Sequence, residues 1–327
     1  MPSLYPLTFQ PAFKERVWGG RTLESLYHKN LPPTVPIGES WEISDRPGDE
    51  SVIANGPLAG KNLRWLMEHH ADELLGKVKP TPDNRFPLLC KILDARDRLS
   101  LQVHPPASKA AELGGEPKTE MWHITDATPG AELYVGLKPG VTRAEFEQKI
   151  QTGEVAECFH RIPVRAGDTM FLPSGRVHAI GAGLVIFEIQ QNSDTTYRVF
   201  DWNRVGLDGK PRELHIPQSL ASIDFNDFAP PLADTSFSAA GNFQVRPLVR
   251  NPLFNADVFR ALAKETILFR QPRLRILAVL ENRVTATAAN VSVELQPGQF
   301  CLLPASSGEV ALANETGSSF LLVEPGE

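Results

Sequence analysis

Short apolar runs separated by turn residues make up most of this chain. Runs of four to eight residues rich in Val, Ile, Leu and Phe, and bounded by Gly, Pro, Asn or Asp, are typical of β-strands. We expect strands at residues 88–94, 99–104, 119–125, 131–137, 168–173, 184–190 and 196–202, and again at 243–249, 257–262, 274–280, 291–295, 299–304, 309–313 and 319–324. The pattern therefore predicts a protein dominated by β-structure.

The 3.6-residue period of an amphipathic helix is confined to a few segments. We expect helices at residues 60–75, 107–113, 142–151, 153–160 and 217–222. Because these segments are few and short, we expect them to lie at the periphery of the strands.

One segment has the composition of a linker. Residues 225–241 mix proline, small residues and acids without a sustained period, which is typical of a connection between domains. We therefore divide the chain into a first domain at residues 1–224 with helical insertions, a linker at 225–241, and a β-rich domain at 242–327.

A weak internal repeat agrees with this division. Residues 167–173 (GDTMFLP) and 298–304 (GQFCLLP) share a glycine, five mostly apolar residues and a proline. Each is followed by a further strand that ends in a glutamate, at Glu188 and Glu324. Two related β-barrels in tandem explain the repeat, and chance recurrence of a common turn is the alternative.

Composition and charge narrow the class of protein. The chain is 42% hydrophobic and 22% charged, which suits a folded core. Its net charge of −6, without any dense basic stretch, argues against nucleic acid as a partner. The chain has neither a long apolar run nor a signal-like N-terminus, so we expect no membrane association. Three widely spaced cysteines indicate a reducing, cytoplasmic location. No sequence feature demands a partner chain, so we expect a monomer.

Residues 167–178, GDTMFLPSGRVH, resemble the second signature motif of the cupin superfamily, which consists of small metal-binding jelly rolls. Glycine and proline form the tight corner between two strands, and His178 then points into the barrel. In the second repeat, Glu309 replaces the histidine and the second glycine is missing. The predicted fold is therefore two tandem cupin-like jelly-roll β-barrels with a few peripheral helices, of which the second, degenerate barrel holds no metal.

Two other segments offer further metal ligands. In LSLQVHP, Gln102 and His104 are two residues apart and share one face of a strand, and in KTEMWHI, Lys118 and Glu120 do the same. Together with His178, the glutamine, the histidine and the glutamate form a set of nitrogen and oxygen ligands. Such a set suits one zinc ion, or another divalent metal such as cobalt or manganese.

Four motifs, LSLQVHP, KTEMW, GDTMFLPSGRVHAIG and NSDTTYRVFDWNR, occur in the order found in the type I mannose-6-phosphate isomerases, and the chain resembles their short bacterial form. The resemblance begins with VWGG and GESWEIS near the N-terminus and covers nearly the whole chain. It implies a zinc-dependent aldose–ketose isomerase that interconverts the sugar phosphates mannose 6-phosphate and fructose 6-phosphate.

The resemblance also implies roles for individual residues. The implied metal ligands are His104, Glu120, His178 and, by comparison with longer members, Gln102. Arg198 falls at the position of the family's essential arginine. Ser100 and Arg204 fall where longer members contact the phosphate, although those members carry lysine in place of Arg204. A guanidinium and an ammonium bind phosphate with different geometry.

The chemistry of isomerisation adds two candidates. Moving a carbonyl between C1 and C2 requires removal of a neighbouring proton and stabilisation of the resulting enediolate. A Lewis-acid metal polarises the carbonyl, and Arg198 supplies a permanent positive charge. Lys118 and Glu188 are the candidate proton carriers. Lys118 would need a depressed pKa, which burial beside a dication would provide.

Two other functions fit parts of the pattern. His104, Glu120 and His178 also match the two-histidine, one-carboxylate triad of a non-haem iron oxygenase. Gln102 would occupy a position that oxygen needs there, and the predicted cations suit a phosphosugar better than an apolar substrate. A non-catalytic sugar-binding cupin is the other alternative, and it would bind ligand without turnover.

Overall fold

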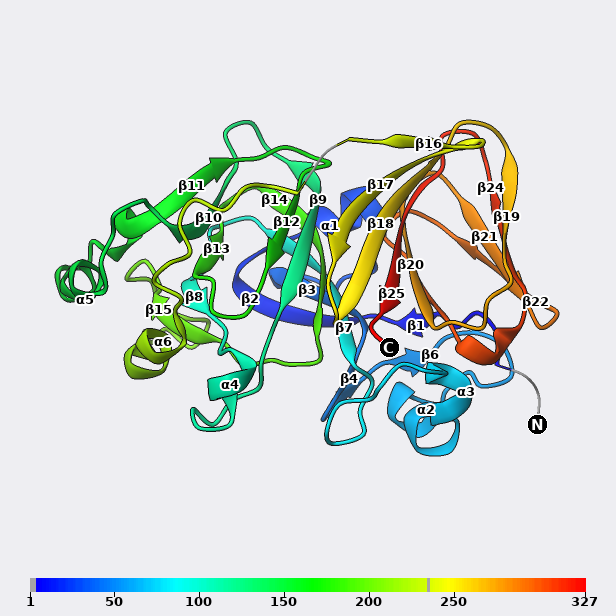
Figure 1. The fold of residues 1–327 in the computed structure, drawn as a ribbon, viewed down its shortest axis with the longest axis horizontal. Helices are drawn as coiled ribbons and strands as arrows, with labels where there is room; N and C mark the ends of the chain where they lie inside the picture. The colour runs from blue at the N-terminus through cyan, green and yellow to red at the C-terminus, as the bar shows by residue number, and fades with distance from the viewer. Residues whose placement is uncertain (1–3, 234–235) are drawn as a thin grey trace.

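The computed structural model describes residues 4–233 and 236–327, and antiparallel strands dominate it (Figure 1). The first pair of sheets uses strands from the first 200 residues. Its six-stranded sheet has the order β12 (Thr169–Leu172), β9 (Glu120–Ala127), β14 (Leu184–Gln191), β7 (Leu88–Ala95), β3 (Ile37–Ile43) and β2 (Ala12–Gly20). Its five-stranded sheet has the order β11 (Phe159–Pro163), β10 (Glu132–Leu137), β13 (His178–Ile180), β8 (Leu101–Val103) and β15 (Tyr197–Phe200).

The second pair of sheets lies beside the first (Figure 1). Its six-stranded sheet has the order β16 (Ser238–Ala240), β17 (Phe243–Arg250), β18 (Phe254–Ala261), β25 (Ser319–Pro325), β20 (Arg275–Glu281) and β23 (Phe300–Leu303). Its four-stranded sheet has the order β19 (Glu265–Phe269), β24 (Val310–Asn314), β21 (Val284–Ala288) and β22 (Val291–Leu295). Two small pairs complete the strands: β1 (Phe9–Gln10) with β6 (Val52–Ile53), and β4 (Asp45–Arg46) with β5 (Asp49–Glu50).

The internal repeat corresponds to equivalent strands. Read from β12, the first six-stranded sheet follows the same sequence of connections as the second sheet read from β23. Both edge strands follow a glycine with positive φ, +92° at Gly167 and +80° at Gly298, a conformation that other residues rarely adopt. The all-β expectation is confirmed. The boundaries at 224 and 242 stay a prediction, and β16 lies inside the segment expected to be a linker.

Helices are short and peripheral, as expected. They are α1 (Thr22–Tyr27), α2 (Leu63–His69), α3 (Ala71–Leu75), α4 (Ala107–Ala110), α5 (Arg143–Thr152) and α6 (Ile216–Ser222), with 3-10 turns η1 (Val155–Cys158) and η2 (Ala305–Ser307). The Thr142 hydroxyl caps α5 by accepting a hydrogen bond from the Glu145 amide. The helix predicted at 60–75 is divided into α2 and α3, and most of the one predicted at 153–160 is η1. No helix in the described ranges is long and apolar enough to cross a membrane.

The sequence pattern missed strands at the N-terminus, and β3 shows the reason. Its sequence IGESWEI reads as mixed polar and apolar, yet every residue in it is buried. Glu39 and Glu42 are both less than one-tenth exposed, and each is paired with a lysine. A strand that buries charged side chains on both faces has no hydrophobic alternation for a sequence pattern to detect.

One hydrophobic cluster joins the two pairs of sheets. It contains Phe187 of β14 and Phe300 of β23, whose ring centroids are 5.2 Å apart. Leu7 exchanges backbone hydrogen bonds of 2.9 and 2.8 Å with Leu302. Because apolar surface is buried between the pairs, we expect them to unfold together.

Replacing Phe187 with alanine should lower the free energy of unfolding by about 3–5 kcal/mol, because it leaves a cavity between the two pairs of sheets. Urea denaturation followed by fluorescence and circular dichroism measures this change. The exposed Leu268, replaced by alanine, is the control and should change the free energy by less than about 0.5 kcal/mol. Two separate transitions in the wild-type protein would contradict the shared core.

Candidate metal centre and the cavity beside it

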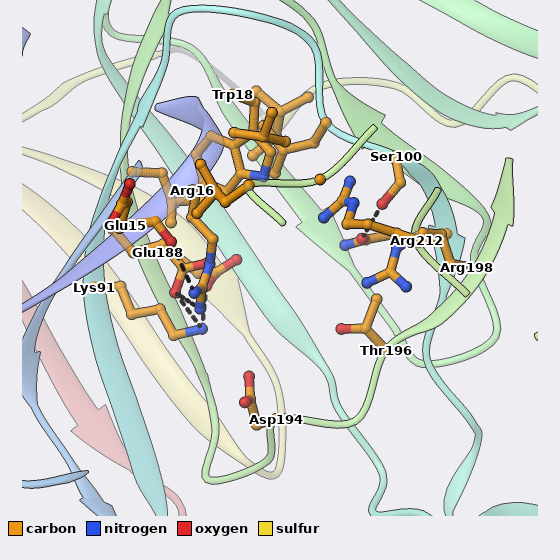
Figure 2. Close-up of a pocket in the computed structure, with 18 of the residues that line it drawn as sticks. Glu15, Arg16, Trp18, Lys91, Ser100, Glu188, Asp194, Thr196, Arg198 and Arg212 are labelled. Atoms are coloured by element: carbon orange, nitrogen blue, oxygen red, sulfur yellow. Dashed lines mark hydrogen bonds and ion pairs between the residues drawn. The ribbon is translucent and has the colours of Figure 1, made fainter. Parts of the chain in front are cut away.

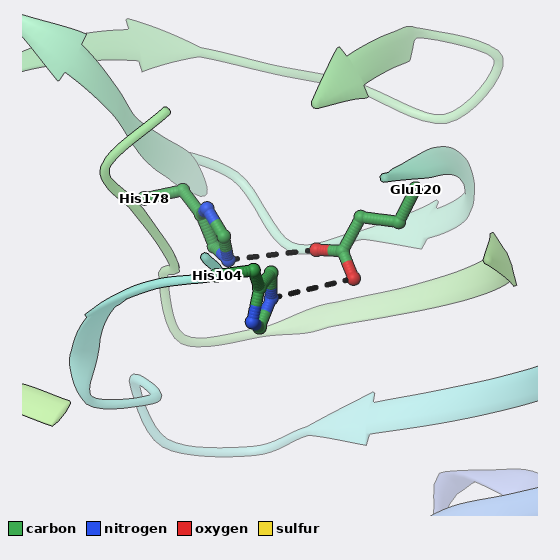
Figure 3. Close-up of side chains that lie close together, drawn as sticks. All are labelled: His104, Glu120 and His178. Atoms are coloured by element: carbon green, nitrogen blue, oxygen red, sulfur yellow. Dashed lines mark ion pairs between the residues drawn. The ribbon is translucent and has the colours of Figure 1, made fainter. Parts of the chain in front are cut away.

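Three predicted ligands converge from distant parts of the chain. His104 follows β8, Glu120 begins β9 and His178 begins β13, and all three side chains are fully buried. Their potential ligand atoms lie within 4.8 Å of one another (Figure 3). Two neighbouring strands of one sheet and a strand of the facing sheet thus supply the group, as expected for the interior of a jelly roll.

Backbone carbonyls orient both imidazoles. Nδ1 of His104 lies 2.8 Å from the Thr195 carbonyl, and Nδ1 of His178 lies 2.9 Å from the Arg176 carbonyl. Each Nδ1 can only donate to a carbonyl, so the Nε2 lone pair faces inward. Burial lowers the pKa of both histidines, to about 3 for His178. Neutral rings with inward lone pairs are the form that binds a metal.

Glu120 completes the group as an anion. Its oxygens lie 3.6 Å from Nε2 of His104 and 3.5 Å from Nε2 of His178. Burial would raise its pKa, but the Lys118 ammonium, 2.6 Å away, opposes burial, and the pKa lies well below its usual value. Oε1 is buried and accepts no hydrogen bond from any residue that the structure describes. A buried anionic oxygen between two imidazole lone pairs fits a divalent cation.

Gln102 lies beside this group. It is opposite His178 in the strand register, and its amide nitrogen is 3.3 Å from Nε2 of that histidine. Its amide oxygen accepts a hydrogen bond of 3.3 Å from Ser100. A glutamine binds a metal through its oxygen, so a ligand role would require the amide to turn over.

A cavity of about 520 Å³ opens next to these residues (Figure 2). Predicted site residues that line it are Ser100, Gln102, Lys118, Glu188 and Arg198. Figure 2 shows two groups across the cavity, with Ser100, Arg198 and Arg212 on one side and Lys91 and Glu188 on the other. A small polar ligand would therefore meet a different set of charges at each end.

Arg204 is not among the residues lining the cavity. Its guanidinium pairs with Asp201 at 2.9 Å and with Asp97 at 3.5 Å. Arg212 lines the cavity instead, and Asp201 also accepts two hydrogen bonds from it, of 2.7 and 2.6 Å. The sequence reasoning missed Arg212 because it lies in an irregular loop, where no periodicity places a side chain. Its only sequence signal is that it follows two other arginines closely in a segment with few acids.

Arg198 belongs to the same group of cations. It donates a hydrogen bond of 2.8 Å to the Glu213 carbonyl, and no described residue accepts from its buried Nε. Burial and then the charge of Arg212 lower its pKa. Arg204 and Arg212 pair with Asp201, and Arg204 also pairs with Asp97, so three guanidiniums including Arg198 meet two carboxylates and leave local positive charge available for an anion.

The pKa values of the two candidate proton carriers are raised by different causes. Burial would lower the pKa of Lys118, but Glu120 at 2.6 Å and Glu188 at 4.0 Å raise it above its usual value. The expected depressed pKa of Lys118 is therefore not produced by the chain's own charges. Burial raises the pKa of Glu188, which accepts a hydrogen bond of 2.9 Å from Trp122 Nε1. The raised pKa moves the Glu188 carboxylate toward the range of a general base at neutral pH, whereas the raised pKa of Lys118 keeps that side chain a cation.

Lys91 is a cavity residue that sequence reasoning missed. It lies on β7 with its ammonium 3.5 Å from Glu188 and 3.7 Å from Glu39, and its side chain is 4% exposed. A lysine in the middle of the apolar run LLCKILD was the available signal, because a charge at such a position needs a buried partner.

The second pair of sheets has different residues at the positions of the ligands. By strand register and the repeat offset, Arg275 stands for Glu120 and Glu309 for His178. Arg275 pairs with Glu324 at 2.8 Å, and the exposed Glu309 pairs with Arg270 at 2.9 Å. These two positions therefore carry a cation and a carboxylate that is already paired with an arginine, in place of the glutamate and histidine of the first pair of sheets.

Comparisons with known proteins agree with this geometry. A family model described as phosphomannose isomerase type I, catalytic domain, matches residues 7–126. The mannose-6-phosphate isomerase ManA of Bacillus subtilis is 36% identical over 316 residues, which cover 94% of this chain and 95% of that protein. The mannose-6-phosphate isomerase of Streptococcus mutans is 36% identical over 91% of this chain and 92% of its own length.

Solved structures show the same similarity. The crystal structure of the mannose 6-phosphate isomerase from Bacillus subtilis aligns with a TM-score of 0.88 at 30% identity, over 98% of this chain and all of that one. A putative mannosephosphate isomerase from Archaeoglobus fulgidus aligns over all of this chain and 99% of its own, with a TM-score of 0.76. At 21% identity the archaeal protein shows a common fold.

Replacing His178 with glutamine should weaken the binding of a divalent metal by at least about 100-fold, because even residues that only orient ligands contribute 10–100-fold. Metal retained after gel filtration, measured by elemental analysis per folded chain, tests this. His123→Gln is the matched control, since His123 is equally buried but hydrogen-bonds Thr169 outside the group. Equal metal contents in the two variants would contradict the assignment.

Proposed function

Because this chain belongs to the type I mannose-6-phosphate isomerase family, we propose that it interconverts mannose 6-phosphate and fructose 6-phosphate with one bound divalent metal ion. The observation that carries the proposal is the group of His104, Glu120 and His178 beside a cavity with cations at one end and buried carboxylates at the other. A phosphosugar has the matching polarity, because its charge is at one end and its reacting carbonyl at the other.

The metal would be held by His104, Glu120 and His178, with Gln102 as a fourth ligand after its amide turns. We propose zinc, with cobalt or manganese as replacements, since imidazole and carboxylate ligands suit these borderline ions. When bound, the metal supplies a Lewis acid that polarises the sugar's carbonyl. The chain's own residues then have to hold the substrate and move a proton.

Phosphate binding is proposed for Ser100, Arg198 and Arg212, which lie together at one side of the cavity. Arg204, expected from the family pattern, would act through Asp201, which it shares with Arg212. Arg198 has a second proposed role, because its fixed charge also stabilises negative charge that develops on the sugar.

Proton transfer between C1 and C2 is proposed for Glu188. It is buried, its pKa is raised, and the Trp122 hydrogen bond fixes its carboxylate. Lys118, charged and 2.6 Å from Glu120, would serve as a proton donor to an oxygen of the sugar. The wall of buried charges favours isomerisation of a polar sugar over oxidation of an apolar substrate. We also propose that the protein is cytoplasmic, because its three free, buried cysteines suit a reducing compartment, and that it acts as a monomer.

The purified protein should convert mannose 6-phosphate to fructose 6-phosphate in a coupled assay. Chelation should reduce the activity by more than about 100-fold, and zinc, cobalt or manganese should restore it. In deuterated water the product should acquire deuterium at the carbon that gains a hydrogen. Full activity after complete metal removal, or oxygen-dependent turnover with iron, would contradict this function.

Arg212→Ala should raise the KM for mannose 6-phosphate by about 10–100-fold with a smaller change in kcat, because phosphate contacts act in the ground state and the transition state alike. Like Arg212→Ala, the control Arg204→Ala removes one guanidinium partner of Asp201, but it leaves the cavity wall intact. The KM of this variant should therefore change by less than about threefold. Steady-state kinetics of the two variants decides the question. A larger effect at Arg204 would restore the family pattern.

A further inference from the structure

A line of six alternating charges runs from the molecular surface to the metal ligands. Its members, in order, are Arg16, Glu39, Lys91, Glu188, Lys118 and Glu120. Successive nitrogen–oxygen distances are 3.0, 3.7, 3.5, 4.0 and 2.6 Å. Only Arg16, at the outer end, is substantially exposed, with 32% of its side chain accessible. Figure 2 shows the part of the line made by Arg16, Lys91 and Glu188.

Lys91 occupies the middle of this line between two carboxylates. A buried ammonium is stable only when it is closely paired, because desolvation costs several kcal/mol for an isolated ion. Lys91 is 4% exposed and shares its charge between Glu39 and Glu188. Its ammonium also lies 4.8 Å from the centre of the Trp41 ring, which adds a cation–π contact.

Glu39 has hydrogen-bond partners in addition to Lys91. Its Oε2 accepts a hydrogen bond of 2.6 Å from Trp41 Nε1, and Arg16 donates two more, of 3.0 Å to Oε1 and 3.3 Å to Oε2. Burial would raise its pKa, but Lys91 and Arg16 outweigh burial and hold the pKa at about 2. The carboxylate is therefore ionised at neutral pH, and three hydrogen bonds orient it.

We propose that Glu39, braced by Arg16 and Trp41, is a positioning residue for isomerisation that holds the Lys91 ammonium in the cavity wall. This inference rests on the proposed function. Without Glu39, Glu188 would be the remaining carboxylate partner of Lys91 among the described residues, and the ammonium would move toward it. Glu188 would then be drawn from the Trp122 hydrogen bond that orients it toward the sugar. Glu39 thus keeps the candidate base available without touching the substrate's reacting atoms.

The same strand provides a matched control. Glu42, three residues further along β3, is 5% exposed and pairs with Lys29 at 2.7 Å. Neither Glu42 nor Lys29 lines the cavity. Replacing Glu39 or Glu42 by glutamine removes one charge from a buried ion pair on one strand, so a purely structural role predicts similar losses for the two.

The experiment measures kcat, KM, metal content and urea stability for the metal-loaded full chain and its variants. Glu39→Gln should lower kcat by about 10–100-fold, the range for residues that orient others. Its KM should change less than threefold and its metal content should be unchanged. Glu42→Gln should keep kcat within about twofold, whatever stability it loses. A kcat for Glu39→Gln within twofold of wild type would overturn the inference.

A double-mutant cycle tests whether Glu39 acts through Lys91. The kcat of the Glu39→Gln, Lys91→Met double variant should equal that of Lys91→Met alone, because Glu39 has nothing left to position. Multiplicative losses would overturn the inference. Should Glu39→Gln not fold, Arg16→Met is the substitute variant, because Arg16 braces Glu39 and is partly exposed. It should lose threefold to tenfold in kcat, and an unchanged kcat would overturn the inference. A wild-type protein that does not turn over mannose 6-phosphate would instead overturn the proposed function.

Discussion

The structure depends on keeping a carboxylate ionised where water cannot reach it. Glu120 is completely buried, and an isolated carboxylate there would take up a proton rather than stay charged. Two neutral imidazoles and the Lys118 ammonium surround it, and the imidazoles are in turn fixed by backbone carbonyls. The polar side chains of His104, His178 and Lys118 therefore surround one buried anion. A divalent cation is the ligand that suits this carboxylate and the two imidazoles best.

Much of this centre could be predicted from sequence because it uses local rules. Residues two apart on a strand share a face, and this rule predicted that Gln102 lies next to the ligands. The corner formed by glycine and proline predicted that His178 points into the barrel. The repeat at residues 167–173 and 298–304 predicted two related barrels, and the two large sheets have the same strand order. These features depend on neighbours in the chain, so the chain's own pattern records them.

The residues that were missed have in common that only tertiary contacts explain them. Lys91 and Glu39 are buried charges on neighbouring strands, and each depends on partners that are distant in the sequence: they pair with one another, Lys91 also pairs with Glu188, and Glu39 also pairs with Arg16. Arg212 reaches the cavity from an irregular loop, held there by Asp201, so no period could place it. The same limitation applies to Arg204, because a family pattern aligns positions along the chain but does not say which of two nearby guanidiniums lines the cavity. Its phosphate contact stays a prediction.

Strand β14 carries neighbouring side chains with opposite tasks. Glu188 faces the cavity, and Phe187 faces away from it onto Phe300 in the second pair of sheets. The second pair of sheets thus packs against the rear face of the strand that bears the candidate base. At the positions equivalent to the ligands, this second pair carries ion pairs. A chain shortened to its first pair of sheets would expose the apolar face of that strand to solvent, so the second pair contributes to the candidate site by stabilising the strand from behind.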